Sequence, residues 1–317
     1  MGSRRRAVAG PASVLCVGQA TLDHVLTVAD DLVVGRKHAA QRHDVVGGGL
    51  AANAAVTVSR LGGAAALASV IGDDETGNSV LAGLHGEHID TGLVQQARDV
   101  HTSFSAVIVS ADGARTIVNH SPAELLVHPC PDLDDVACDA VLVDGRWPGG
   151  TSSALSLARR RDVPGVVDVD RSAVDAAVIA TCFDLASHLV FSEDALRDLA
   201  GTPSPTDGLR RIARDTAAHV SVTLGARGVL WFDGDDVRSL GAFPVDAVDT
   251  TGAGDVFHGA VTLALAEGAD EARAFAFASA AAALKCTRPG ARAGIPNRIE
   301  VDSLIDRSPI AREVAAT

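Results

Sequence analysis

Short apolar runs separated by longer amphipathic stretches recur along most of the chain. Residues 14–18 and 67–71 are apolar and short, and the Ala-rich stretch 50–61 between them stops at Gly62-Gly63. This pattern predicts a buried strand, a helix and a second buried strand. The same rhythm continues through strand candidates at residues 141–143, 166–168, 189–191 and 220–222. It predicts a doubly wound α/β fold, in which helices flank both faces of a mostly parallel sheet.

Two segments depart from this rhythm. Residues 22–46 alternate polar and apolar side chains with few helix signals, and the β-rich runs 104–109 and 115–119 flank an Asp-Gly turn. Asp-Gly between such runs is a strong hairpin signal. We expect segments of about 20–46 and 100–120 to form a small β lid. The lid is inserted in a single domain that spans residues 13–310, after a disordered tail at residues 1–12.

Composition narrows the possible partners and location. The chain has 317 residues, of which 47% are hydrophobic and 3% aromatic, so small side chains must build the core. Its net charge of −13 argues against binding nucleic acid or an anionic membrane, and no apolar stretch is long enough to span a bilayer. Five scattered cysteines without metal-ligand spacing indicate reduced thiols in a cytoplasmic protein.

The segment from Asp249 to Asp255, Asp-Thr-Thr-Gly-Ala-Gly-Asp, is the most informative one. We expect a strand at residues 245–248 before it and a helix after it. Gly252, Ala253 and Gly254 would then lie at a helix N-terminus, where free backbone N–H groups and the helix dipole attract an anion. A carboxylate in that turn can take a proton from an attacking hydroxyl, which indicates phosphoryl transfer. The alternative is a plain strand-to-helix connection with a favourable Asp in its first turn.

This segment resembles the C-terminal signature of the ribokinase-like, or PfkB, carbohydrate kinases. Gly47-Gly48-Gly49, Asn53 and Arg60-Leu61-Gly62 resemble the family's N-terminal signature, and the resemblance runs from residue 14 to about residue 296. A GxxxxGK[ST] loop is missing from the sequence, so the chain is not a P-loop enzyme. The resemblance implies a ribokinase-like fold and an ATP-dependent sugar kinase that uses ATP and Mg²⁺.

The resemblance also implies roles for individual residues. Asp255 would be the general base, and Gly252, Ala253 and Gly254 would form the anion hole for the transferring phosphoryl group. The residues implied to bind the sugar are Asp23, Gly48, Gly49 and Asn53, and those implied to bind the nucleotide are Thr223, Gly225, Gly228 and Thr251. Many family members organise Mg²⁺ through an Asn-x-x-Glu motif. Ser192-Glu193-Asp194-Ala195 stands there in this chain, which makes Glu193 a candidate Mg²⁺ ligand through water. Some family members also bind a monovalent cation, and the resemblance makes Asp249 a candidate ligand for that ion.

Three further residues near predicted strand ends suggest an anionic substrate. Lys37, Asn119 and Arg146 together can hold an oxyanion, with Arg146 as the main fork-like donor after a strand, although each can also be an ordinary surface group. The residues around Arg146 and the segments 283–290 and 294–296 look like those of 6-deoxy-6-sulfofructose kinases. That branch phosphorylates the C1 hydroxyl of a sulfonated ketose.

Other readings stay open at this point. Sulfonate and phosphate are both tetrahedral oxyanions, so fructose 6-phosphate, tagatose 6-phosphate, 2-keto-3-deoxygluconate or a nucleoside are alternative substrates. A non-catalytic sugar-binding regulator on the same fold is another alternative, but we would expect it to lack the base or the anion hole. Extended lid strands with exposed edges tend to be covered, so we expect a homodimer formed through the lid.

Overall fold

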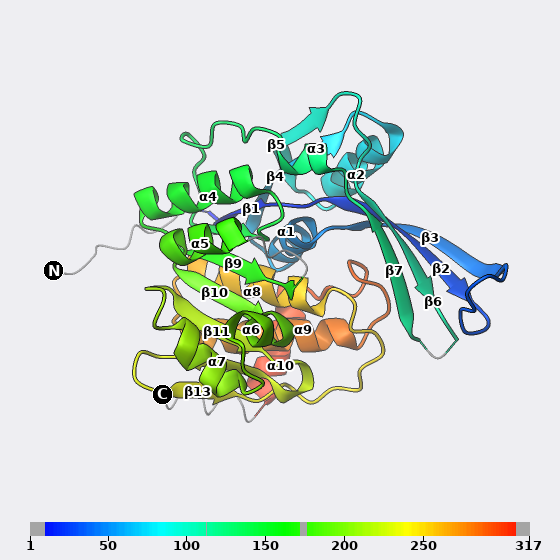
Figure 1. The fold of residues 1–317 in the computed structure, drawn as a ribbon. Coiled ribbons are helices and arrows are strands. Elements are labelled where there is room, and N and C mark those ends of the chain that lie inside the picture. Colours follow the sequence, from blue (N-terminus) through cyan, green and yellow to red (C-terminus); the bar gives the residue numbers. More distant parts are fainter. Residues whose placement is uncertain (1–9, 112, 172–175, 309–317) are drawn as a thin grey trace.

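The computed structural model describes residues 10–111, 113–171 and 176–308. Within these residues, nine strands form a large sheet in the order β13-β12-β11-β10-β9-β8-β1-β4-β5 (Figure 1). Neighbours from β11 to β5 pair in parallel, and β12 and β13 are antiparallel. The strands are β1 (Ser13–Val17), β4 (Ala64–Gly72), β5 (Asp90–Ala97), β8 (Ala140–Val143), β9 (Gly165–Val169), β10 (His188–Ser192), β11 (His219–Thr223), β12 (Val229–Phe232) and β13 (Val237–Leu240).

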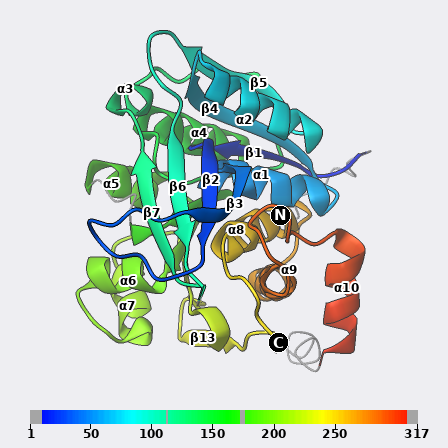
Figure 2. The ribbon, with the colours of Figure 1, turned by 90° about the vertical axis from the view of Figure 1, so that its right-hand side faces the viewer.

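Helices cover both faces of the large sheet, as Figure 2 shows in a view along its edge. One face packs against α1 (Leu50–Arg60), α2 (Glu75–Gly86), α8 (Ala253–Ala266), α9 (Glu271–Cys286) and α10 (Arg298–Arg307). The other packs against α3 (Ala123–Leu126), α4 (Pro148–Arg161), α5 (Ala176–Leu185), α6 (Glu193–Ala200) and α7 (Pro205–Ile212). Because both faces are covered, strands such as β8 and β9 are buried at every position. The predicted doubly wound α/β fold is confirmed.

A separate small sheet forms the lid, in the order β3-β2-β6-β7. Its strands are β2 (Thr21–Val28), β3 (Ala40–Gly48), β6 (Phe104–Val109) and β7 (Arg115–His120). The predicted hairpin is present, since β6 and β7 pair from Phe104↔His120 to Val109↔Arg115. Asp112 of its turn, residues 1–9 of the predicted tail and the end of the predicted domain at 309–310 lie outside the described residues. The lid projects away from the large sheet (Figure 1).

The strand that we expected at residues 245–248 is wrong. Residues 241–250 contain no regular secondary structure. Pro244 cannot donate to a ladder, and the N–H groups of Val248 and Asp249 donate to the carbonyl of Cys286 at 2.7 and 3.1 Å. The segment is therefore fixed by the end of α9 rather than by a neighbouring strand.

Two further predictions concerned membrane-spanning helices and the state of the cysteines. None of the helices in the described part of the chain combines the length and the apolar character needed to cross a bilayer. All five cysteines are free, and Cys16 and Cys182 are buried. Burial raises the pKa of the Cys182 thiol to about 12, which keeps it protonated and unreactive.

Candidate active site

The segment that begins at Asp249 ends in the first turn of α8. Gly252 is the N-cap of this helix and has φ of 74°, a left-handed conformation that favours glycine. Its carbonyl accepts the Val256 N–H at 3.0 Å. The first N–H groups of a helix have no partner inside the helix, so this turn can receive an anion beside Asp255.

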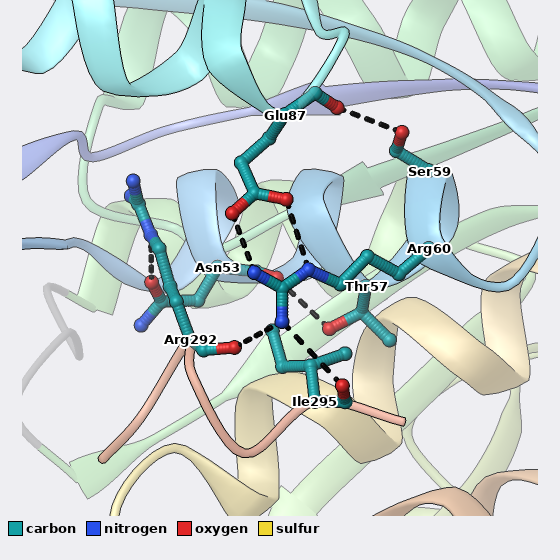
Figure 3. Close-up of polar contacts among 7 residues, drawn as sticks. All are labelled: Asn53, Thr57, Ser59, Arg60, Glu87, Arg292 and Ile295. Carbon is teal, nitrogen blue, oxygen red and sulfur yellow. Dashed lines mark hydrogen bonds and ion pairs between the residues drawn. The ribbon is translucent and has the colours of Figure 1, made fainter. Parts of the chain in front are cut away.

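Asp255 lies next to a fixed amide. Asn53 of α1 donates through Nδ2 to Asp255 Oδ2 at 2.6 Å. The orientation of this amide is set from its other side, because Arg292 Nε donates to Asn53 Oδ1 at 2.8 Å (Figure 3). Burial raises the pKa of Asp255 to about 7, and the nearby carboxylates of Asp168 and Asp144 add to the rise while the Asn53 hydrogen bond opposes it. Such a carboxylate can accept a proton near neutral pH.

Arg292 is itself held by further polar contacts, of which Figure 3 shows those with Asn53 and Arg60. Its Nη2 donates to the carbonyl of Gly48 at 2.9 Å, and its own carbonyl accepts from Arg60. Arg60 in turn forms a forked pair with Glu87 at 2.9 and 2.5 Å. The sequence pattern did not single out Arg292. Gly47 was the one available signal in the sequence. A Cβ at this position would lie 1.9 Å from Arg292 Nη1, so only glycine leaves room for the guanidinium.

The candidate sugar-binding residues lie around the same contacts. A Cβ on Gly48 would lie 2.3 Å from Asp23 Oδ2, and Gly49 adopts φ of 89° where the chain enters α1. The lid register pairs Asp23 with Ser105 and Ser105 with Asn119. Directly paired residues point to the same face of a sheet, so Asp23 and Asn119 share one lid face.

Arg146 follows β8 at the carboxyl edge of the large sheet. The buried Asp144 carboxylate fixes its backbone, since it accepts N–H groups from Arg146 at 2.9 Å and from Gln19 at 2.7 Å. The Arg146 side chain lines a cavity together with Gln19 and Ser103, and its Nη2 lies 3.5 Å from Asp170 Oδ2. Gln19 also donates to Ser121, two residues beyond Asn119, at 3.0 Å. The lining of this cavity includes Arg146 but not Asn119.

Lys37 does not join them in this structure. It is exposed in the loop after Val28, beyond the Val28↔Ala40 pair that ends the β2–β3 ladder. Asp23 lies five strand residues nearer the root of the lid, a separation of about 16 Å along an extended chain. The antiparallel register carries the loop to the far tip, so the expected trio of Lys37, Asn119 and Arg146 is not assembled.

The candidate nucleotide residues follow β11. Thr223 ends that strand, a short 3₁₀ turn covers Gly225–Arg227, and Gly228 has φ of 90°. A Cβ on Gly228 would lie 2.0 Å from the carbonyl of Leu240, so the turn needs glycine there. Glu193, the candidate magnesium ligand, begins α6 at the end of the adjacent strand and forms an ion pair with Arg227 of this turn.

Asp249, the candidate ligand for a monovalent cation, already has two basic partners. Its Oδ1 accepts from Arg115 of the lid at 2.6 Å and from the Thr251 N–H at 2.8 Å. The fully buried Lys285 donates to its carbonyl oxygen at 2.6 Å, and Gly290 N–H donates to Oδ2 at 2.8 Å. Burial raises the pKa of Asp249, but these hydrogen bonds and the Lys285 charge outweigh it and bring the pKa to about 2.

A third buried acid lies beneath the site. Asp168 in β9 is 5% exposed, and His258 Nδ1 of α8 lies 3.3 Å from its Oδ2. Burial raises the pKa of Asp168 well above its ordinary value, and Asp170 and Asp144 add to the rise. Sequence reasoning missed Asp168 and His258 because each stood inside an apolar run that predicted only core.

Comparisons with known proteins agree with this geometry. Residues 11–298 match the pfkB family of carbohydrate kinases. Ribokinase of Bacillus subtilis is 29% identical over 92% of this chain and 99% of its own length.

Two solved structures share the fold over nearly the whole chain. A putative ribokinase from Agrobacterium tumefaciens is 36% identical, with a TM-score of 0.88 over 96% of this chain and 99% of its own. Arabidopsis thaliana ribokinase complexed with ribose and ATP is 25% identical, with a TM-score of 0.84 over 94% and 100%. The chain therefore belongs to the pfkB family of carbohydrate kinases, and it is an ATP-dependent sugar kinase.

Proposed function

We propose that Asp255 removes the proton from the sugar hydroxyl that attacks the γ-phosphate of ATP. Its raised pKa, its place in the first turn of α8 and its fixed contact with Asn53 support this role. The N–H groups of Gly252, Ala253 and Gly254 stabilise the charge on the phosphoryl group in transfer. Asp23, Gly48, Gly49 and Asn53 hold the sugar, and Thr223, Gly225, Gly228 and Thr251 hold the nucleotide.

Magnesium fits the carboxyl edge of the sheet. Mg²⁺ takes oxygen ligands, keeps several waters and is usually bound with the substrate phosphates rather than in an all-protein cage. Glu193 offers a carboxylate at the end of β10, beside the turn of Thr223 and Gly225, and Arg227 holds it in place. We assign Glu193 as a ligand through water, and the bound ion would neutralise charge on the phosphates.

For the sugar, we propose 6-deoxy-6-sulfofructose, phosphorylated at its C1 hydroxyl to give the 1-phosphate. The observation that carries this is Arg146, a guanidinium that lines a cavity at the carboxyl edge with its backbone fixed by Asp144. Asn119, on the substrate-facing side of the lid, adds an amide donor nearby. An arginine fork suits a sulfonate because it offers parallel N–H donors.

A second candidate is a neutral sugar such as ribose. Two observations favour it: the solved relative that is complexed with ribose, and the position of Lys37 at the far tip of the lid. Asp170 near the guanidinium would then be the principal partner of Arg146.

The decisive experiment measures ADP release with sulfofructose, fructose 6-phosphate, fructose and ribose on one enzyme preparation. We expect the highest kcat/KM with sulfofructose. Arg146→Ala should raise KM for sulfofructose by about 10- to 100-fold, the cost of a charge-assisted hydrogen bond, and change KM for fructose little. Arg160→Ala, a surface arginine paired with Asp134, is the matched control. Equal losses on both sugars, or a preference for ribose, would remove the sulfonate from the proposal.

We also propose that two copies of the chain pair through their lids. Val45, His24, Ala106 and Val118 form one row across the lid, on the face opposite Asp23. Val45 is 50% exposed and Val118 61%, while Ile117 and Val46 are exposed on the other face; exposed apolar side chains on a sheet face are candidates for an interface. Light scattering should show a dimer, and Val118→Asp should convert it to a monomer. A monomeric unmodified protein would contradict the proposal.

A further inference from the structure

Two histidines lie side by side at the edge of the sheet opposite the reaction site. His188 begins β10 and His219 begins β11, and the two residues are direct partners in the parallel ladder. Their rings stack with centroids 5.0 Å apart and planes 17° from parallel. The proposed catalytic groups follow the other ends of these strands. The length of a five-residue strand, about 13 Å, therefore separates the histidines from that edge.

A carboxylate completes the group from the next layer. Glu271, the first residue of α9, places Oε1 3.8 Å from His188 Nε2 and 3.5 Å from His219 Nε2. Both separations are too long for a direct hydrogen bond. One ligand atom from each of the three residues lies within 4.8 Å of the other two. Tetrahedral zinc with bonds of 2.0–2.2 Å spaces its ligand atoms about 3.4 Å apart, so a contraction together with a rotation of the stacked rings would enclose an ion.

The hydrogen bonds around His188 allow the tautomer that a metal ligand needs. Ser187 Oγ accepts the Gly165 N–H at 2.8 Å and lies 3.2 Å from the Gly165 carbonyl, to which its hydroxyl can donate. It is also 2.8 Å from His188 Nδ1. When Ser187 donates its one proton to the Gly165 carbonyl, it accepts from His188 Nδ1–H, and Nε2 then keeps a lone pair. A hydrogen bond to the second ring nitrogen is the usual support of a metal-binding histidine.

The Nε2 lone pair of His188 points toward Glu271 without a partner of its own. His188 is 9% exposed, and its Nε2 is buried with no hydrogen bond to any described residue. A cation between Nε2 and the Glu271 carboxylate would give this buried nitrogen a partner.

We propose that His188, His219 and Glu271 bind a divalent transition-metal ion, with zinc preferred. Two imidazoles and one carboxylate are a common zinc ligand set, and water can fill the fourth position. The site is open to solvent because the His219 side chain is 54% exposed and that of Glu271 34%. The ion would join two strands to the first turn of α9, the helix that carries Lys285 to Asp249 at its other end. The site is therefore structural and separate from phosphoryl transfer.

The test uses the tag-free full chain, stripped with EDTA, in the absence of nucleotide. Titration with ZnCl₂ against a chromophoric chelator should give one site per chain. Zinc at 100 times Kd should raise Tm by about 5 °C. Co²⁺ should give the intense visible absorption of a tetrahedral site. An unchanged Tm with saturating zinc would overturn the proposal.

Two variants and one control test which residues bind the ion. His219→Gln, at a largely exposed position, should weaken zinc binding by more than about 100-fold, and Ser187→Ala should weaken it by about 10- to 100-fold through the tautomer of His188. His43→Gln is the matched control, because His43 and His24 form the other stacked histidine pair, in the lid, with ring nitrogens 3.2 Å apart. Zinc binding that survives His219→Gln, or that is lost in His43→Gln, would exclude the three-residue site.

Discussion

Asp249 and Asp255 begin and end one short segment, and the fold gives their carboxyl groups opposite properties. Arg115, Lys285 and two backbone N–H groups surround Asp249, and its pKa falls to about 2. Burial raises the pKa of Asp255 to about 7, and the buried acids Asp168 and Asp144 add to the rise while its amide partner Asn53 opposes it. Both residues lie near the same helix N-terminus, so the helix dipole alone does not separate them.

The difference in pKa suggests different roles for the two carboxylates of this motif. A carboxylate that stays ionised under nearly all conditions fixes the loop, because it holds Thr251, Gly290 and the lid residue Arg115 in place. A carboxylate whose pKa is near neutrality can gain and lose a proton during turnover. On this view Asp249 is structural and Asp255 is chemical, although the sequence presents the same residue twice.

The sharpest test replaces each carboxylate by its amide and measures turnover. Asp255→Asn removes the proposed base, so kcat should fall by about 10²- to 10⁴-fold while sugar and ATP still bind. Asp249→Asn is the matched control in the same segment, and its kcat should fall far less. Coupled measurement of ADP release with binding calorimetry separates the two effects. Turnover of Asp255→Asn within a few fold of the unmodified enzyme would refute the division.

The same two variants should change stability in opposite directions. The folded pKa of Asp249 is lowered, so this group stabilises the fold above about pH 4, and the stabilisation is lost as pH falls toward 2. The folded pKa of Asp255 is raised, so the unfolding free energy decreases as pH rises from about 4 to 7. At pH 8, Asp249→Asn should lose about 1–2 kcal/mol and Asp255→Asn should gain a similar amount.

Denaturant unfolding at pH 8 measures both free energies, and repetition at pH 5 checks the cause. The gain for Asp255→Asn should shrink at pH 5, because the unmodified group is then protonated in the folded state. Loss of stability in both variants at pH 8 would contradict the opposed environments.

A smaller effect concerns the pH profile. Because Asp255 must be ionised to act as a base, kcat/KM should decrease as pH falls through about 7. The Asn53 amide donates to the carboxylate and favours its ionised form, so Asn53→Ala should move the midpoint to higher pH by about one unit. Ser59→Ala, on the same helix but bonded to the Glu87 carbonyl, should leave it in place. Identical midpoints for Asn53→Ala and the unmodified enzyme would argue against this contact.

The sequence predicted the parts of this arrangement that are local. Apolar runs marked the parallel strands, and the Asp-Gly turn marked the lid hairpin, because each signal lies within a few adjacent residues. Residues 245–248 misled us, because this segment is largely exposed, with Val248 at 67%, and its backbone is fixed by the Cys286 carbonyl rather than by a ladder.

The partners of the motif were not predictable in the same way. Asn53 and Asp255 are 202 positions apart, and Arg292 is 239 positions from Asn53. Such pairs depend on which helices and loops pack together, which the order of the strands decides. The position of Lys37 also depends on a distant feature, because the register of the β2–β3 hairpin places its loop at the far end of the lid.

The smallest expected effect returns to Asp249. The ammonium of Lys285 is fully buried and lies 2.6 Å from the Asp249 carbonyl oxygen and 3.6 Å from its Oδ1. With Arg115 it already supplies the positive charge that a bound monovalent cation would bring. We therefore expect kcat to change less than about twofold when K⁺ is replaced by Na⁺ or tetramethylammonium, with the ionic strength held constant so that screening does not change. Lys285→Met should lower activity and make it depend on K⁺. Strong activation of the unmodified enzyme by K⁺ would instead mean that Asp249 binds the ion despite its two basic neighbours.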